Sequence, residues 1–140
     1  MSGFLLDTNI LSELVRPKPD ARVTSWFEST GEEPLFLSVL TLGEIRKGIS
    51  ALTDGPRQAR LEAWLNHSLM PRFRDRILPV DLDIADRWGR IAGSLAAKGT
   101  GLPVIDGLMA ATALHHNLTL VTRNVGDVAA TGVPVFDPWK

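Results

Sequence analysis

The sequence predicts an α/β fold, a parallel sheet with helices on both faces. Short apolar runs typical of strands alternate along the chain with longer segments whose apolar residues recur at helical spacing. Parallel strands need crossover connections, and the helices in those connections cover the sheet. The length of 140 residues fits one ordinary domain, so we expect a single domain over residues 1–140.

Five apolar segments are the expected strands, namely residues 4–6, 35–39, 77–80, 118–122 and 133–136. The fifth contains Pro134, which has no amide hydrogen for a neighbouring strand, so we expect it at an edge of the sheet. Apolar residues at helical spacing predict helices within residues 10–15, 23–27, 42–52, 61–69, 84–95 and 104–116.

Composition excludes several classes of function. The chain has no cysteine, which rules out disulfides, cysteine-ligated metals and a thiol nucleophile. No stretch approaches the ~20 apolar residues of a membrane helix. The N-terminus lacks the basic region of a secretory signal. We therefore expect a soluble cytoplasmic protein with no membrane partner.

Four acidic residues occupy places where open α/β sheets bind ligands, beyond the carboxyl ends of the strands. Asp7 ends the first strand, Asp127 follows the fourth, and Glu44 and Asp106 lie in first turns of helices. Each also has a structural interpretation. Asp7 can cap a helix, Thr41-Leu42-Gly43-Glu44 fits a capping box, Asp106 can complement a helix dipole, and Asp127 can be a turn residue.

Together the four acids suggest a metal site. Several carboxylates in one pocket raise one another's pKa, and a hard divalent cation such as Mg²⁺ or Mn²⁺ relieves their repulsion. Sequence spacing alone leaves open whether the four side chains converge.

Four segments resemble, in order, the motifs of PIN-domain proteins. Residues 5–14 (LLDTNILSEL), 37–45 (LSVLTLGEI) and 102–113 (LPVIDGLMAATA) each carry one acid, and residues 120–124 (LVTRN) precede the fourth. The ending Val135-Phe136-Asp137-Pro138-Trp139 is most similar to the FitB-like branch of the VapC toxins. Two residues depart from that pattern: Val128 stands where an aromatic is common, and Asp137 where asparagine is usual.

The resemblance implies a PIN-like sheet of strand order 3-2-1-4-5 and an endoribonuclease that hydrolyses RNA as the toxin of a type II toxin–antitoxin pair. It also implies one or two Mg²⁺ or Mn²⁺ ions, a homodimer, and a small DNA-binding antitoxin that covers the acidic groove, often with an arginine entering it. By this resemblance, the catalytic and metal-holding residues are Asp7, Glu44, Asp106 and Asp127. The supporting polar residues are Thr8, Asn9, Thr122 and Asn124.

The formal net charge of −1 argues against a nucleic-acid partner, which usually requires a basic surface. Without the four candidate acids, however, 12 acidic residues face 15 basic ones. Binding of nucleic acid should therefore depend on metal as well as on salt. The candidate RNA-binding residues are Arg72, Arg74, Arg76 and Arg123, although a solvated helix face and loop explains the first three equally well.

Two other functions stay open. One is a non-catalytic or DNA-associated regulator of PIN fold that binds nucleic acid. The other is a Mg²⁺-dependent phosphotransfer or phosphatase domain, although Asp7-Thr8-Asn9 lacks the second acid of the phosphatase motif. The adjacent His115 and His116 point about 100° apart on a helix, so they do not suit one metal ion. Trp139 is expected to be buried by docking of the tail.

Overall fold

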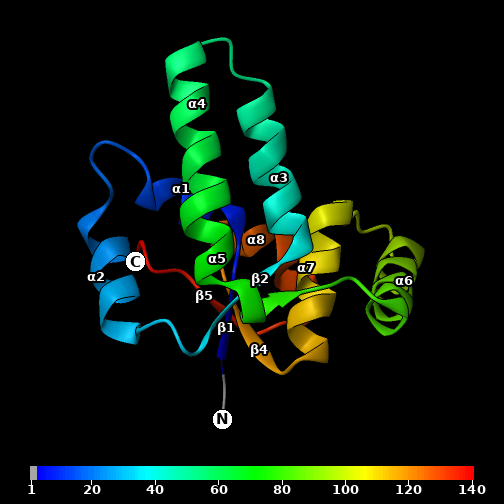
Figure 1. The fold of residues 1–140 in the computed structure, drawn as a ribbon. Coiled ribbons are helices and arrows are strands. Elements are labelled where there is room, and N and C mark those ends of the chain that lie inside the picture. Colours follow the sequence, from blue (N-terminus) through cyan, green and yellow to red (C-terminus); the bar gives the residue numbers. More distant parts are fainter. Residues whose placement is uncertain (1–2) are drawn as a thin grey trace.

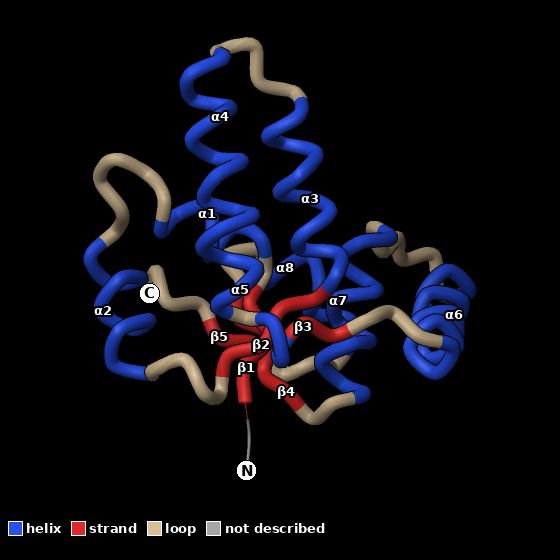
Figure 2. Tube along the Cα trace, in the orientation of Figure 1, coloured by secondary structure: helices blue, strands red, loops and turns tan. Residues whose placement is uncertain are grey.

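The computed structural model describes residues 3–140, so the first two residues of the predicted domain lie outside the described part. Five parallel strands form one sheet in the order β3-β2-β1-β4-β5. They are β1 (Gly3–Leu6), β2 (Leu35–Ser38), β3 (Ile77–Leu78), β4 (Leu118–Val121) and β5 (Val135–Phe136). The predicted order is confirmed, and the predicted edge position of the fifth strand is correct. Figure 2 shows the sheet at the centre of the molecule.

Eight α-helices surround the sheet over the described residues. They are α1 (Thr8–Leu14), α2 (Ala21–Thr30), α3 (Val39–Ser50), α4 (Gly55–Trp64), α5 (Met70–Arg72), α6 (Leu82–Ala97), α7 (Val104–His115) and α8 (Val125–Val128). A π-helical turn over Leu65–Leu69 continues α4. Helices α3 and α4 form a long hairpin that rises from the sheet (Figure 1).

Neighbouring residues of the central strand pack on opposite faces of the sheet, because side chains alternate along a strand. Leu6 belongs to an apolar cluster that includes residues of α1, α2 and α3. Leu5 belongs to a second cluster, built mainly on α7 and β4. Both side chains are fully buried. The sheet is therefore covered on both faces, as predicted, and its carboxyl edge is where functional side chains can gather.

Over residues 3–140, no helix combines the length and the apolar character that a membrane crossing requires.

Candidate active site

Asp7 lies at the carboxyl end of β1 and begins α1 as its N-cap. Its Oδ1 accepts a hydrogen bond from the backbone N of Thr8 at 2.7 Å. Its Oδ2 accepts hydrogen bonds from Thr122 Oγ1 at 2.8 Å and from Asn9 Nδ2 at 3.4 Å. With only 9% of its surface exposed, Asp7 is a buried carboxylate fixed by three donors. The predicted capping role is confirmed, and it leaves the carboxylate at the edge of the sheet.

Glu44 reaches the same edge from α3, but the predicted capping box is wrong. The N-cap of α3 is Ser38, whose hydroxyl accepts from the backbone N of Leu40 at 3.0 Å. Thr41 is fully buried, and its hydroxyl lies 3.5 Å from the carbonyl O of Leu6. Glu44 is thus in the second turn, beyond the reach of the cap. Its Oε1 accepts a 2.6 Å hydrogen bond from Thr8 Oγ1 instead.

Asp106 and Asp127 complete the set from the other half of the sheet. Asp106 lies in the first turn of α7, as predicted. Because α7 leads back to the start of β4, its N-terminus lies at the carboxyl edge. Asp127 is in α8, not in a turn as expected, and is exposed. Within the part of the chain that the structure describes, neither carboxylate accepts a hydrogen bond from a side chain.

The four acids lie close enough to influence one another's protonation. Burial raises the pKa of Asp7 against the hydrogen bonds from Thr122 and Thr8, and the charges of Glu44 and Asp127 raise it further. Burial likewise raises the pKa of Asp106, followed by repulsion from Asp7, Asp127 and Glu44. The fold therefore brings Asp7, Glu44 and Asp106 to one hollow, and places Asp127 where its charge acts on Asp7 and Asp106.

Thr122 connects the polar residues around Asp7. Besides donating to Asp7, its buried hydroxyl oxygen accepts from Asn9 Nδ2 at 3.3 Å and from the backbone N of Asn124 at 3.0 Å. Asn9 Oδ1 in turn accepts from the backbone N of Arg123 at 3.4 Å. Three of the predicted supporting residues thus form side-chain hydrogen bonds around the acids, namely Thr8, Asn9 and Thr122. Asn124 contributes its backbone N–H to this network.

Replacing Thr122 by Val is expected to lower the free energy of unfolding by about 1–3 kcal/mol, because it removes a donor to a buried carboxylate. Valine keeps the shape and strand propensity of threonine, so the loss reports the hydrogen bonds. Urea unfolding measures it. The matched control is Thr119→Val on β4, the strand that Thr122 follows; Thr119 is only partly buried, and its replacement should change stability little. Equal effects of the two substitutions would contradict this role of Thr122.

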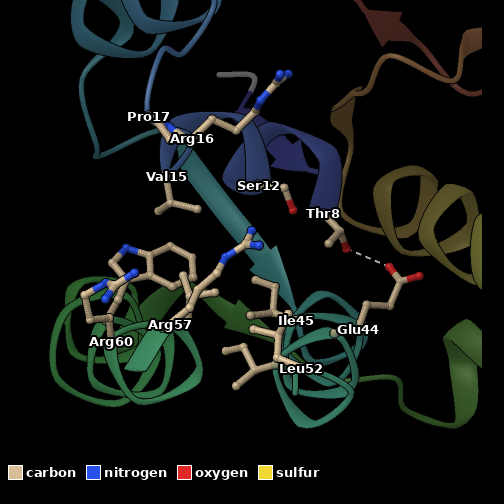
Figure 3. A pocket seen from close by; sticks show the side chains of 14 residues that line it. Thr8, Ser12, Val15, Arg16, Pro17, Glu44, Ile45, Leu52, Arg57 and Arg60 are labelled. Carbon is tan, nitrogen blue, oxygen red and sulfur yellow. Dashed lines mark hydrogen bonds between the residues drawn. The ribbon is translucent and has the colours of Figure 1, made fainter. Parts of the chain in front are cut away.

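A hollow of roughly 430 Å³ opens over three of the four acids, and Asp127 is not part of its lining. It is lined by Asp7, Thr8, Asn9, Ser12, Glu13, Arg16, Glu44, Asp106, Arg123, Asn124 and Trp139. A larger groove of roughly 1000 Å³ adjoins it between α1, α3 and α4, and shares Thr8, Ser12, Arg16 and Glu44 with it. Figure 3 shows this groove, with Glu44 turned toward Thr8. The larger groove is mainly apolar, so the acidic hollow is the place for chemistry.

A family model described as PIN domain matches residues 4–126. The chain belongs to the PIN-domain family. It is 40% identical to toxin FitB of Neisseria gonorrhoeae over 97% of this chain and 98% of that protein. It is 32% identical to VapC ribonuclease Y4jK of Sinorhizobium fredii over 98% of each chain. A solved structure of FitAB bound to IR36 DNA superposes with a TM-score of 0.92 at 38% identity, covering 98% of this chain and 96% of that one.

The acidic cluster of this PIN domain suits a hard divalent cation by donor type, because all four side chains offer carboxylate oxygens. Placement is a separate question. Over residues 3–140, no three His, Cys, Asp or Glu side chains are placed so that they could hold one ion together. The acids therefore share one edge at a range where their charges interact, and their side chains would have to close on an ion to ligate it.

Two of the candidate RNA-binding arginines have structural roles in the PIN domain. Arg76 donates to the carbonyl O of Leu35 at 2.7 Å, and Arg72 pairs with Glu32. Leu35 begins β2, so these side chains lie at the amino end of the sheet, opposite the acids. Arg74 is exposed at that same end. The structure thus favours the alternative interpretation of this cluster.

Arg123, by contrast, lies at the acidic hollow. Its guanidinium lies over the ring of Trp139, 5.0 Å from the centroid. Trp139 is 5% exposed, which confirms the expected docking of the tail. Sequence reasoning missed Glu13 and Arg16, which also line the hollow. Their spacing of three residues, at the end of the helix predicted within residues 10–15, was the available signal.

Proposed function

We propose that this PIN domain is the toxin of a type II toxin–antitoxin pair and acts in the cytoplasm as a metal-dependent endoribonuclease. The observation that carries the proposal is the gathering of four acids at the carboxyl edge of the sheet, with Asp7 fixed by three hydrogen bonds. Similarity over nearly the whole chain to proteins named toxin FitB and VapC ribonuclease Y4jK supports the class of substrate.

The proposed ligands of the cation, Mg²⁺ or Mn²⁺, are Asp7, Glu44 and Asp106, with Asp127 holding a second ion or a water around the first. A bound divalent cation supplies charge stabilisation on the phosphodiester and a water of lowered pKa. The chain positions these ligands. Thr8 orients two of them at once, because its backbone N donates to Asp7 and its hydroxyl donates to Glu44.

Asp106 has a second part in the proposal, besides holding the cation. It is half-buried, accepts no side-chain hydrogen bond from the described residues, and has a raised pKa. Such a carboxylate can turn toward a water and accept its proton, which the firmly bonded Asp7 is less able to do. We therefore assign orientation and deprotonation of the attacking water to Asp106.

The proposed partners are RNA, a second copy of the chain, and a small DNA-binding antitoxin. The solved FitAB complex on a DNA fragment supports the antitoxin. The acidic hollow offers the antitoxin a way to inhibit RNA cleavage. A guanidinium of the antitoxin pairs well with two carboxylates and would occupy the place of a cation.

Removing divalent metal with EDTA is expected to stop RNA cleavage, and Mg²⁺ or Mn²⁺ in excess is expected to restore it. End-labelled RNA on a denaturing gel measures this. Asp106→Asn, purified in parallel, is the control for contaminating nuclease and should remain inactive with metal.

Each of the two other functions predicts a different result in these experiments. Tight RNA binding without cleavage in Mn²⁺ would indicate the non-catalytic regulator. A trapped aspartyl-phosphate would indicate phosphotransfer. Cleavage by Asp106→Asn at the wild-type rate would contradict the site.

A further inference from the structure

Glu13 is a buried carboxylate that the proposed mechanism does not use. It lies on α1, two turns after Asp7, and is 5% exposed. Its Oε1 accepts from Arg16 Nη1 at 3.1 Å, and its Oε2 accepts from the backbone N of Asp20 at 2.8 Å. The hydrogen bond from Asp20, followed by that from Arg16, lowers the pKa of Glu13 despite burial. Glu13 is therefore a fixed negative charge at neutral pH.

Arg16, the partner of Glu13, lies at the lip between the two hollows. It lines both the acidic hollow and the groove between α1, α3 and α4. Its side chain is 61% exposed. Among residues 3–140, Glu13 is the one acidic residue that forms an ion pair with Arg16. Figure 3 shows Arg16 directed away from Glu44. Most of its N–H donors thus face solvent beside the acids.

The position of Arg16 at the lip of the acidic hollow has a physical explanation. An arginine keeps its charge at any ordinary pH, and its planar guanidinium binds two carboxylate oxygens at once. Beside Asp7, Glu44 and Asp106 it would be attracted into the cluster, where it would compete with a divalent cation. Glu13 offers a carboxylate outside the cluster. It also anchors the loop after α1 through Asp20, and so holds the arginine at the lip.

We propose that Arg16 binds a phosphate of the RNA strand beside the scissile bond, and that Glu13 is a positioning residue that keeps Arg16 out of the acid cluster. This inference rests on the proposed function. A guanidinium matches the oxygens of a phosphate as well as those of a carboxylate. The guanidinium of Arg123, the other arginine of the hollow, lies over the ring of Trp139.

The first test concerns Arg16 and phosphate. RNA binding is measured by fluorescence anisotropy in an Asp7→Asn background without metal, over a range of salt concentrations. Arg16→Ala should weaken binding, and the slope of log affinity against log salt should fall by about 0.7, the value for one contact to single-stranded RNA. The control is Arg90→Ala, which removes an exposed arginine paired with Asp86 on α6. An unchanged slope in Arg16→Ala would overturn the assignment of Arg16.

The second test concerns Glu13 and uses binding of Mn²⁺, followed by electron paramagnetic resonance, in chains with all four acids intact. Glu13→Gln keeps an acceptor for Asp20 but releases Arg16. Apparent Mn²⁺ affinity should fall by roughly tenfold or more, as for other groups around a metal site. The double variant Glu13→Gln/Arg16→Ala should recover wild-type affinity, because the competing guanidinium is gone. Asp86→Asn is the matched control.

The outcomes separate this inference from the proposed function. A double variant as weak in Mn²⁺ binding as Glu13→Gln alone would overturn the role of Glu13, since the defect would then be structural. Unaltered Mn²⁺ affinity in Glu13→Gln would overturn it too. Both assays read binding without cleavage. If the wild-type chain fails to cleave RNA while these effects appear, the proposed function fails and the arrangement of Glu13 and Arg16 stands.

Discussion

Replacing Asp7 by Asn is expected to lower RNA cleavage on the order of 10³-fold, comparable to the loss of a charge-stabilising group from an active site. Asparagine has the same shape, and its Oδ1 can still accept the hydrogen bond from the backbone N of Thr8. Its Nδ2 takes the place of Oδ2, so asparagine loses the acceptor of the hydrogen bonds from Thr122 and Asn9 as well as the negative charge that the proposed cation needs. Single-turnover cleavage of labelled RNA, with metal in excess, measures the effect.

The same substitution should change the stability of the fold through two opposing effects, the loss of two hydrogen bonds and the loss of a buried charge. Because the pKa of Asp7 is raised on folding, its ionised form costs folding free energy at any pH above its unfolded value. That cost disappears in acid, where the carboxyl is protonated in both states. Relative to the wild type, Asp7→Asn should therefore be more stable in urea at neutral pH than below about pH 4, because only the lost hydrogen bonds count in acid. A variant unfolded at pH 7 would attribute the lost cleavage to the fold instead.

The fold was predictable from the sequence because each strand of the PIN domain is an apolar run bounded by residues that end it. Strand boundaries were less accurate. The second strand was expected to reach Val39, yet Ser38 caps α3 and ends it one residue earlier. The third was expected over four residues and pairs through only Ile77 and Leu78. In both cases a helix cap or a neighbouring strand decides the end, and neither is visible in apolar periodicity.

The site was predictable in position and less so in its contacts. The acids follow strand ends, so topology places them at one edge. The bond from Thr8 to Glu44, however, joins residues 36 positions apart, and that from Thr122 to Asp7 joins residues 115 apart. No local pattern encodes such pairs. Clustering in sequence did not show where the arginines lie, because the contacts of Arg76 with Leu35 and of Arg72 with Glu32 place them near the start of β2.

Replacing Trp139 by Ala is expected to lower the free energy of unfolding by about 3–5 kcal/mol, the usual cost of deleting a buried aromatic side chain. Trp139 packs in the cluster that holds Leu6 and Val121, the residues on which β1 and β4 end. Its backbone N donates to Asp137 Oδ1 at 2.9 Å. Asparagine, which the resemblance leads us to expect at position 137, offers the same acceptor, so the departure at Asp137 preserves this turn. Urea unfolding measures the loss.

The effect of Trp139 on RNA binding should be separable from its effect on stability, because the guanidinium of Arg123 lies over the Trp139 ring. Arg123→Ala removes an exposed side chain and should leave the urea midpoint unchanged while weakening RNA binding. Trp139→Phe keeps an aromatic face for the guanidinium at a smaller packing cost, so it should retain RNA affinity better than Trp139→Ala does. If Arg123→Ala binds RNA as the wild type does, the tail of this PIN domain stabilises the sheet edge alone, and the hollow is left with Arg16 as its basic contact.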